Sequence, residues 1–265
     1  MDYIINNEAT LRLSAFLFML SLIFIIELIF PIYVRRIESY RRWIINFSFV
    51  LINTLILRFL FPILAVSFAS ICIKYNIGIF NYFNFNGSFS VIVSFLFLDL
   101  GIWLQHLLFH KVGILWRFHK IHHSDEEVDF TTGIRFHPIE IIISMIYKFI
   151  LIAIIGPSIA LVIIFEIILN ASSIFNHGNI KIKKKYDLNF RKLIVTPNMH
   201  RIHHSEEEKE TNSNYGFNFS IWDRVFGTYR ENSAKGDDLI VGLEEFKDKN
   251  TSSIFMLLLK PFSNK

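Results

Sequence analysis

Residues 89–110 read FSVIVSFLFLDLGIWLQHLLFH, and this stretch decides the fold of the chain. About twenty apolar residues in succession are long enough to cross the hydrocarbon core of a bilayer as a helix. In the second half of this stretch, four side chains are spaced to lie on one face of the helix: Asp99, Trp103, His106 and His110. The stretch therefore predicts a membrane-spanning helix that brings ionisable and metal-binding groups to one of its ends.

Four more apolar runs predict the other membrane segments, at residues 11–34, 43–73, 139–155 and 158–173. The last two are separated by Gly156-Pro157, a turn signal that predicts a helical hairpin. The 265 residues are 52% hydrophobic and 19% charged, with a mean hydropathy of +0.42. We therefore expect an all-α, polytopic membrane helix bundle with four to five crossings or hairpins.

Basic residues predict which way the bundle faces. The pairs Arg35-Arg36 and Arg41-Arg42 follow the first run, and a lysine-rich segment at 181–192 follows the last. By the positive-inside rule both segments lie in the cytoplasm, which puts the N-terminus outside. Every histidine falls on, or just inside, the cytoplasmic side, so we expect a cytosolic, histidine-rich cap. The membrane is expected to be a bacterial inner membrane or the endoplasmic reticulum.

The charge balance and the cysteine count exclude several functions. Lys+Arg number 27 against 23 Asp+Glu, a net charge of +4. With 29 Phe in long apolar runs, this balance fits cationic loops facing anionic lipid, and no nucleic acid is expected as a partner. The single cysteine, Cys72, excludes an internal disulfide, a CxxC site and a cysteine-ligated iron–sulfur cluster.

The histidines are grouped in short motifs along the sequence. All ten are candidate metal ligands: His106, His110, His119, His122, His123, His137, His177, His200, His203 and His204. Two boxes have the form HxxHH. On a helix, positions i, i+3 and i+4 share a face, so each box is predicted to present its imidazoles to one point. Neutral imidazole binds iron, zinc or copper, and this many nitrogen donors suffice for two ions.

Other metal-site patterns are absent from the sequence. It contains no HExxH motif of the zinc proteases and no Glu-x-x-His pair of the ferritin-like di-iron proteins. The acidic clusters beside the boxes, at 125–129 and 206–208, are interpreted as a solvated face from which one carboxylate can orient an imidazole.

With these motifs the sequence resembles the membrane fatty acid hydroxylase and sterol desaturase superfamily. The resemblance covers residues 42–229, and its motifs are DxxxWxxHxxxH from Asp99, LWRFHKIHHSDEEVDFTTGIRFHP from Leu115, FNHGNI from Phe175, and TPNMHRIHHS with NYGFNFSIWDRVFGTY from Thr196 to Tyr229. It implies an all-helical membrane bundle whose histidines hold a non-haem di-iron centre. We expect one domain over residues 1–265, with a catalytic core at about 89–230.

The resemblance also assigns roles to individual residues. Eight histidines carry over as signature ligands: His106, His110, His119, His122, His123, His200, His203 and His204. His177 joins them, whereas His137 matches a motif found in only some branches. Four residues are expected to support the site without binding metal: Asp99, Trp103, Asn179 and Asp223.

The implied chemistry is oxidation of an unactivated C–H bond of a lipid by two iron ions and dioxygen. Side chains alone cannot perform this step, and it requires two external electrons. The chain has no GxGxxG fingerprint and no recognisable haem or iron–sulfur domain, so a separate electron donor is expected, a ferredoxin or a haem carrier with its reductase. The expected substrate is a fatty acyl, sterol or alkylglycerol lipid.

Two alternatives remain open from the sequence. A lipid or sterol desaturase can use the same di-iron site. A metal transporter is the alternative of another class, and it is disfavoured because transporter ligands lie near the bilayer midplane.

Charged residues inside the apolar runs predict an internal ion pair, since such groups need partners in a membrane. Arg58 is expected to pair with Glu27 or Glu166, whereas Lys148 is expected to reach the membrane surface.

Overall fold

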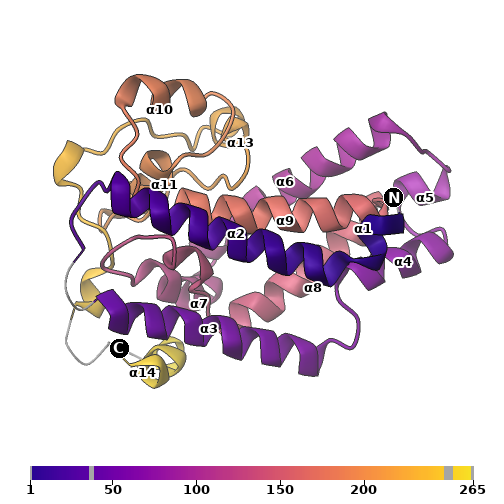
Figure 1. Cartoon of the computed structure of the whole chain (residues 1–265), viewed down its shortest axis with the longest axis horizontal. Coiled ribbons are helices and arrows are strands. Elements are labelled where there is room, and N and C mark those ends of the chain that lie inside the picture. Colours follow the sequence, from indigo (N-terminus) through magenta and orange to yellow (C-terminus); the bar gives the residue numbers. More distant parts are fainter. Residues whose placement is uncertain (1, 36–38, 248–252, 264–265) are drawn as a thin grey trace.

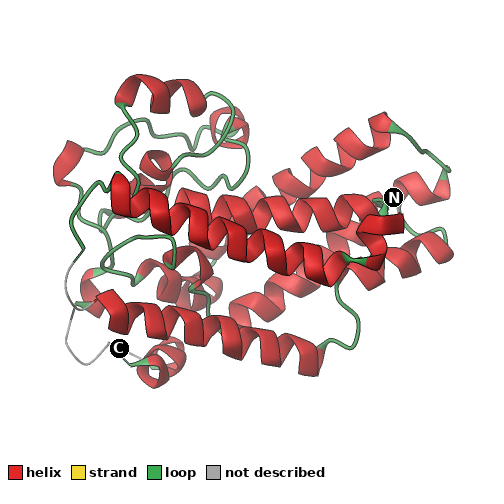
Figure 2. Ribbon diagram, in the orientation of Figure 1, coloured by secondary structure: helices red, strands yellow, loops and turns green. Residues whose placement is uncertain are grey.

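A computed structural model of the chain describes residues 2–35, 39–247 and 253–263. Within these residues the regular structure is helical, and extended pairing is limited to isolated bridges (Figure 2). The predicted all-α class is therefore confirmed. The orientation argument also used Arg36, which lies outside the described residues.

Long helices form the body of the bundle. They are α2 (Glu8–Ile29), α3 (Ser39–Leu60), α6 (Ser88–Lys111), α8 (Pro138–Ile155) and α9 (Ile159–Asn176). Each belongs to a segment long and apolar enough to cross a membrane, and the described residues contain five such segments. The helices run lengthwise through an elongated molecule (Figure 1). The expectation of a polytopic integral membrane protein is confirmed.

The second apolar run is interrupted rather than continuous. Helix α3 ends at Leu60, Pro62 follows, and α4 (Ala65–Lys74) continues the run. Proline lacks the N–H that a helix interior requires, so a break at this position is expected. Helix α4 then packs against α8 and α9 at the end of the bundle that also holds α1 (Asp2–Asn6) and α5 (Ile79–Tyr82) (Figure 1).

Helices α8 and α9 form the hairpin that the sequence predicted. Gly156 adopts a left-handed conformation with φ of 68°, which glycine allows without the steric cost that a side chain imposes. Ser158 then caps α9 by accepting a hydrogen bond from the backbone N–H of Leu161 at 3.3 Å.

Short helices gather at the end remote from the N-terminus, where Figure 1 labels α7, α10, α11, α13 and α14. Their bounds are α7 (Gly113–His123), η1 (Thr132–Ile134), α10 (Lys184–Phe190), α11 (Pro197–His203), α12 (Glu208–Thr211), α13 (Ile221–Val225), η2 (Gly236–Asp238), η3 (Glu244–Phe246), α14 (Ile254–Leu259) and η5 (Lys260–Phe262). These elements form the cap. Helix α14 buries Leu257 against the bundle and exposes Phe255.

A buried ion network attaches the start of α3 to the segment after α7. Arg42 contacts Asp125 at 2.8 Å and also pairs with Asp129, which accepts a 2.8 Å hydrogen bond from the indole N–H of Trp43. Asp125, Glu127 and Asp129 are 1%, 8% and 0% exposed, so the interpretation of 125–129 as a solvated face is wrong for these three carboxylates. Glu126 is exposed, as that interpretation required.

The ion pair predicted for Arg58 is not formed. Glu27 pairs with Arg35, and Glu166 pairs with Lys148 at 2.5 Å, so neither carboxylate contacts Arg58. Lys148 therefore stays inside the bundle and does not reach the membrane surface as expected.

The geometry of α3 explains the difference. Asn46, Phe49 and Asn53 form its buried stripe. Arg58 follows five residues after Asn53, which turns it away from that stripe at 3.6 residues per turn, and its side chain is exposed.

We predict that Arg42→Leu strongly destabilises the protein. The substitution removes the cation that contacts both Asp125 and Asp129, and breaking a buried ion pair in this way typically costs about 3–5 kcal/mol. Thermal unfolding of the purified protein in detergent measures the effect. Arg58→Leu is the matched control and should leave the midpoint unchanged; equal midpoints for the two variants would show that the network is dispensable.

Candidate metal centre

Four segments deliver histidines to the inner side of the cap. The last two turns of α6 carry His106 and His110, and α7 carries the first HxxHH box at its C-terminal end. His177 is the residue that follows α9. Helix α11 carries most of the second box, which ends one residue past the helix.

Nine of the ten histidines form two adjacent groups. We call the first the five-histidine group: His106, His110, His119, His123 and His203. The second is the four-histidine group: His122, His177, His200 and His204. All nine residues are buried, and within each group the nearest ring nitrogens lie within 4.8 Å of one another. The groups touch, because the rings of His123 and His204 stack with centroids 4.4 Å apart.

Each HxxHH box is divided between the groups, so the prediction that a box points to one place is wrong. His119 and His123 enter the five-histidine group, while His122 enters the four-histidine group. The second box does the reverse, since only its middle member, His203, joins the five-histidine group. Residues i+3 and i+4 point about 100° apart on a helix, so they diverge to opposite sides of residue i.

Oxygen atoms of the chain fix the orientation of five rings through Nδ1. A carbonyl oxygen faces Nδ1 of His106, His122, His177 and His203 at 2.6–3.1 Å, and the carboxylate of Glu140 faces Nδ1 of His119 at 2.7 Å. The four carbonyls belong to Tyr215, Arg135, Ser173 and Ser213 respectively. An oxygen acceptor keeps the proton on Nδ1, so Nε2 of each ring presents a lone pair.

These lone pairs face one another at short range. Nε2 of His106 lies 3.2 Å from Nε2 of His119, and Nε2 of His122 lies 3.0 Å from Nε2 of His177. Neither nitrogen of such a pair has a proton to donate, so the contacts are unfavourable without a shared cation. Nitrogens bound about 2.1 Å from one ion lie about 3.0–3.4 Å apart, which matches this spacing. The residues present therefore fit metal ions.

Burial keeps the imidazoles neutral. It lowers the pKa of His177 to about 4 and that of His203 to about 3. Burial together with neighbouring imidazoles holds the pKa of His122, His200 and His204 well below the ordinary range. At neutral pH these rings remain unprotonated and retain the lone pair that metal binding needs.

His137 lies outside both groups. It caps α8, where its Nδ1 accepts a hydrogen bond from the backbone N–H of Ile139 at 3.2 Å, and its Nε2 faces the carbonyl of Leu258 at 3.2 Å. Both ring nitrogens are therefore occupied, which leaves nine of the predicted histidines in position to bind metal.

Two of the predicted supporting residues, Trp103 and Asp223, affect the position of His106 through the backbone of Tyr215. Trp103 donates its indole N–H to Asp223 at 3.0 Å, and Asp223 accepts the backbone N–H groups of Tyr215 and Gly216, each at 2.8 Å. The carbonyl of Tyr215 in turn orients His106. Asp223 therefore positions the loop that holds a histidine and does not contact the imidazole itself.

The other two supporting residues lie farther from the histidines in the bonding network. Asp99 accepts a 2.8 Å hydrogen bond from Trp222 of α13. Asn179 donates its backbone N–H to Glu27 at 2.8 Å and bonds through its side chain to the backbone of Tyr33. These contacts fix the cap on α6 and on the end of α2.

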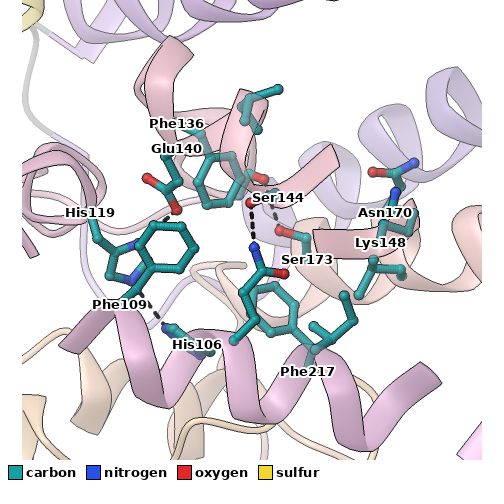
Figure 3. Close-up of a pocket in the computed structure, with 15 residues that line it drawn as sticks. His106, Phe109, His119, Phe136, Glu140, Ser144, Lys148, Asn170, Ser173 and Phe217 are labelled. Carbon is teal, nitrogen blue, oxygen red and sulfur yellow. Dashed lines mark hydrogen bonds and ion pairs between the residues drawn. The ribbon is translucent and has the colours of Figure 1, made fainter. Parts of the chain in front are cut away.

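An apolar cavity of about 180 Å³ opens from the five-histidine group into the bundle (Figure 3). His106 and His119 line it, and the space lies among α6, α8 and α9, three of the helices long and apolar enough to cross a membrane. Its apolar lining consists of Ile102, Phe109, Phe136, Ile141, Leu169 and Phe217. Apolar side chains therefore surround most of the space next to His106 and His119.

Sequence reasoning missed Glu140 as a partner of His119. One signal pointed to it, a lone carboxylate at the start of an apolar run directly after RFHP. Its Oε1 orients the ring, whereas its Oε2 is buried without a hydrogen-bond partner among the described residues. The carbonyls that orient the other rings leave no signal, because every residue type carries one.

Comparisons with known proteins agree with this geometry. The family model for fatty acid hydroxylases matches residues 91–228, just over half of the chain. The chain belongs to the fatty acid hydroxylase family. The predicted family is thus confirmed, and the match falls inside the predicted core at 89–230; the single-domain organisation stays a prediction.

This fatty acid hydroxylase family member is similar to several curated lipid enzymes. It is 28% identical over 179 residues to ornithine lipid hydroxylase OlsE of Rhizobium tropici, covering 67% of this chain and 52% of the relative. It is 28% identical to the alkylglycerol monooxygenase of Homo sapiens and 34% identical to that of Caenorhabditis elegans, covering 57% and 56% of this chain but 32% and 28% of those relatives. The chain thus spans about half or less of their lengths. No solved structure matches it.

We predict that Glu140→Ala weakens metal retention about 10–100-fold, the usual cost of removing the partner of a ligand histidine. Metal content of the purified protein after dialysis against graded chelator measures it. Glu127→Ala is the control, because Glu127 is buried and bonds Ser39 rather than a histidine. Equal retention in the two variants would contradict the assignment.

We predict that His122→Ala and His137→Ala differ sharply in metal content. The first removes a member of the four-histidine group, whereas the second removes a helix cap outside both groups. Elemental analysis of both purified variants should show metal loss only for His122→Ala, while His137→Ala costs about 0.5–2 kcal/mol of stability. Metal loss in both would place His137 among the ligands.

Proposed function

We propose that the protein is a membrane-embedded, non-haem di-iron oxidoreductase that hydroxylates an unactivated C–H bond of a lipid. One observation carries the proposal: two touching groups of buried histidines lie beside an apolar cavity among helices that qualify as membrane spans. Pure nitrogen donor sets of this kind suit iron, zinc or copper. Family membership favours iron within that set.

The proposed ligands are the nine grouped histidines. The five-histidine group would hold one ion and the four-histidine group the other, and His137 is left out. The bound iron pair would supply the activation of dioxygen that side chains cannot provide. The chain's own part is to hold each proton on Nδ1 through its oxygen partner, to exclude water, and to orient a lipid chain toward His106 and His119.

The names of the relatives support oxygen insertion over desaturation. They are called a hydroxylase and monooxygenases, and their named substrates are an ornithine lipid and an alkylglycerol. We propose a lipid of the fatty acyl, sterol or alkylglycerol class for this chain. A metal transporter is disfavoured because the grouped histidines lie in the cap, whereas transporter ligands belong near the midplane.

The proposed reaction needs dioxygen and two electrons from a separate donor, a ferredoxin or a haem carrier with its reductase. We place the cap in the cytoplasm, where such donors and protons are available. Exposed lysines at the cap end support this orientation by the positive-inside rule: Lys181, Lys183, Lys184, Lys185 and Lys192.

We predict that the purified full chain contains about two iron ions per molecule and oxidises a host lipid only with dioxygen and a reductant. Lipids extracted from the host, incubated with the protein under isotopically labelled dioxygen and profiled by mass, should yield a product heavier by one labelled oxygen. His122→Ala combined with His203→Ala removes one ligand from each group and should abolish both iron and product.

The wild-type measurement decides between the alternatives. A product lighter by two hydrogens would replace hydroxylation by desaturation. Bound metal without any lipid change under a competent reductant would overturn the oxidoreductase proposal.

A further inference from the structure

The far end of the cavity carries polar side chains that the metal centre does not use. In Figure 3, Lys148 and Asn170 lie on the side of the pocket away from His119 and His106. Lys148 belongs to α8 and Asn170 to α9, both near mid-length of helices that qualify as membrane spans. Ionisable and amide groups are costly at that depth unless they have a partner.

A polar track connects this end to the histidines. Glu140, Ser144 and Lys148 are spaced four residues apart on α8, so they share one face, and they span two turns, about 12 Å. From α6, Gln105 donates to the hydroxyl of Ser144 at 2.6 Å and fixes the midpoint of the track.

Exposure along the cavity shows where it opens. Glu140, Ser173 and Gln105 near the histidines are 4%, 7% and 8% exposed. Ser144 and Lys148 are partly exposed, and Asn170 is exposed. The closed end thus lies at the histidines and the mouth lies at Lys148 and Asn170, facing the surroundings of the bundle at membrane depth.

The mouth carries excess hydrogen-bond donors. Lys148 pairs with Glu166 at 2.5 Å, but Arg12 pairs with the same carboxylate at 2.8 Å, so two cations share one buried anion. A second carboxylate, Glu8, lies 3.8 Å from Arg12 and does not line the cavity. The ammonium of Lys148 has further N–H groups, and the amide of Asn170 makes no hydrogen bond with the described residues.

We propose that Lys148 and Asn170 form a binding site for an acceptor oxygen of the lipid, a hydroxyl or a carbonyl, about two helical turns from the carbon to be oxidised. A plain hydrocarbon leaves the amide of Asn170 and the further N–H groups of Lys148 without an acceptor, whereas a lipid oxygen can accept hydrogen bonds from them. The reaction at the other end of the cavity rests on the proposed function. The selection of an oxygenated lipid over a hydrocarbon is a property of the mouth alone.

Two matched probes test the site, dodecanol and dodecane, which differ only in one hydroxyl. Binding to the purified full-length protein is measured by competition with a fluorescent fatty alcohol, and iron content is determined in parallel. We expect wild type to bind dodecanol about ten-fold more tightly than dodecane, the worth of one good hydrogen bond to a charged donor. In Lys148→Met and Asn170→Leu the preference should fall to about two-fold, with iron content unchanged.

The control is Ile146→Met, on the same helix but exposed away from the cavity lining, which should keep the full preference. Asn170→Leu preserves the Lys148–Glu166 pair and so tests the site even where Lys148→Met fails to fold. Equal affinity of wild type for the two probes, or an unchanged preference in both variants, would overturn the inference. Selective binding by a protein that oxidises no host lipid under dioxygen and reductant would instead refute only the proposed function.

Discussion

Nine buried imidazoles that are held against one another impose the constraint on which the rest of this molecule depends. In water each Nε2 would be hydrated, but inside the cap water is excluded and the oxygen partners of five rings reserve Nδ1 for the proton. The resulting contacts between lone pairs are unfavourable until cations enter. The surrounding structure has to hold these rings together against that repulsion.

Several ties between distant segments provide this support. Arg42 joins the start of α3 to the segment after the first histidine box, and Glu27 near the end of α2 binds the backbone just past His177. Asp223 gathers the loop whose carbonyl orients His106. Gly133 permits a further close approach, because a Cβ at that position would lie 2.6 Å from the carbonyl oxygen of Ser173, which orients His177. Buried polar contacts thus connect the long helices to the cap, in addition to apolar clusters such as that of Phe49, Ile121, Phe246 and Leu257.

The sequence predicted those features that depend on periodicity and composition. The apolar runs gave the membrane segments, Gly156-Pro157 gave the hairpin, and the HxxHH spacing pointed to a metal site. The sequence did not predict features that depend on which residues lie close together in the folded protein. Arg58 and Lys148 look alike as charges in apolar runs, yet only Lys148 faces a carboxylate on a neighbouring helix. The sequence also did not predict that each HxxHH box is divided between two groups. Residue spacing predicts which histidines share a helix face, but it does not show that two groups of histidines lie next to that face.

The division of each HxxHH box between the two groups sets the order in which the groups can be completed during synthesis. The four-histidine group has a single member, His122, until the chain has been synthesised past α9, and the five-histidine group is incomplete until His203. All five membrane segments precede His200 in the chain. Neither group can therefore be complete before all five membrane segments have been synthesised, and completion of both groups waits for α11 to fold onto helices made before it.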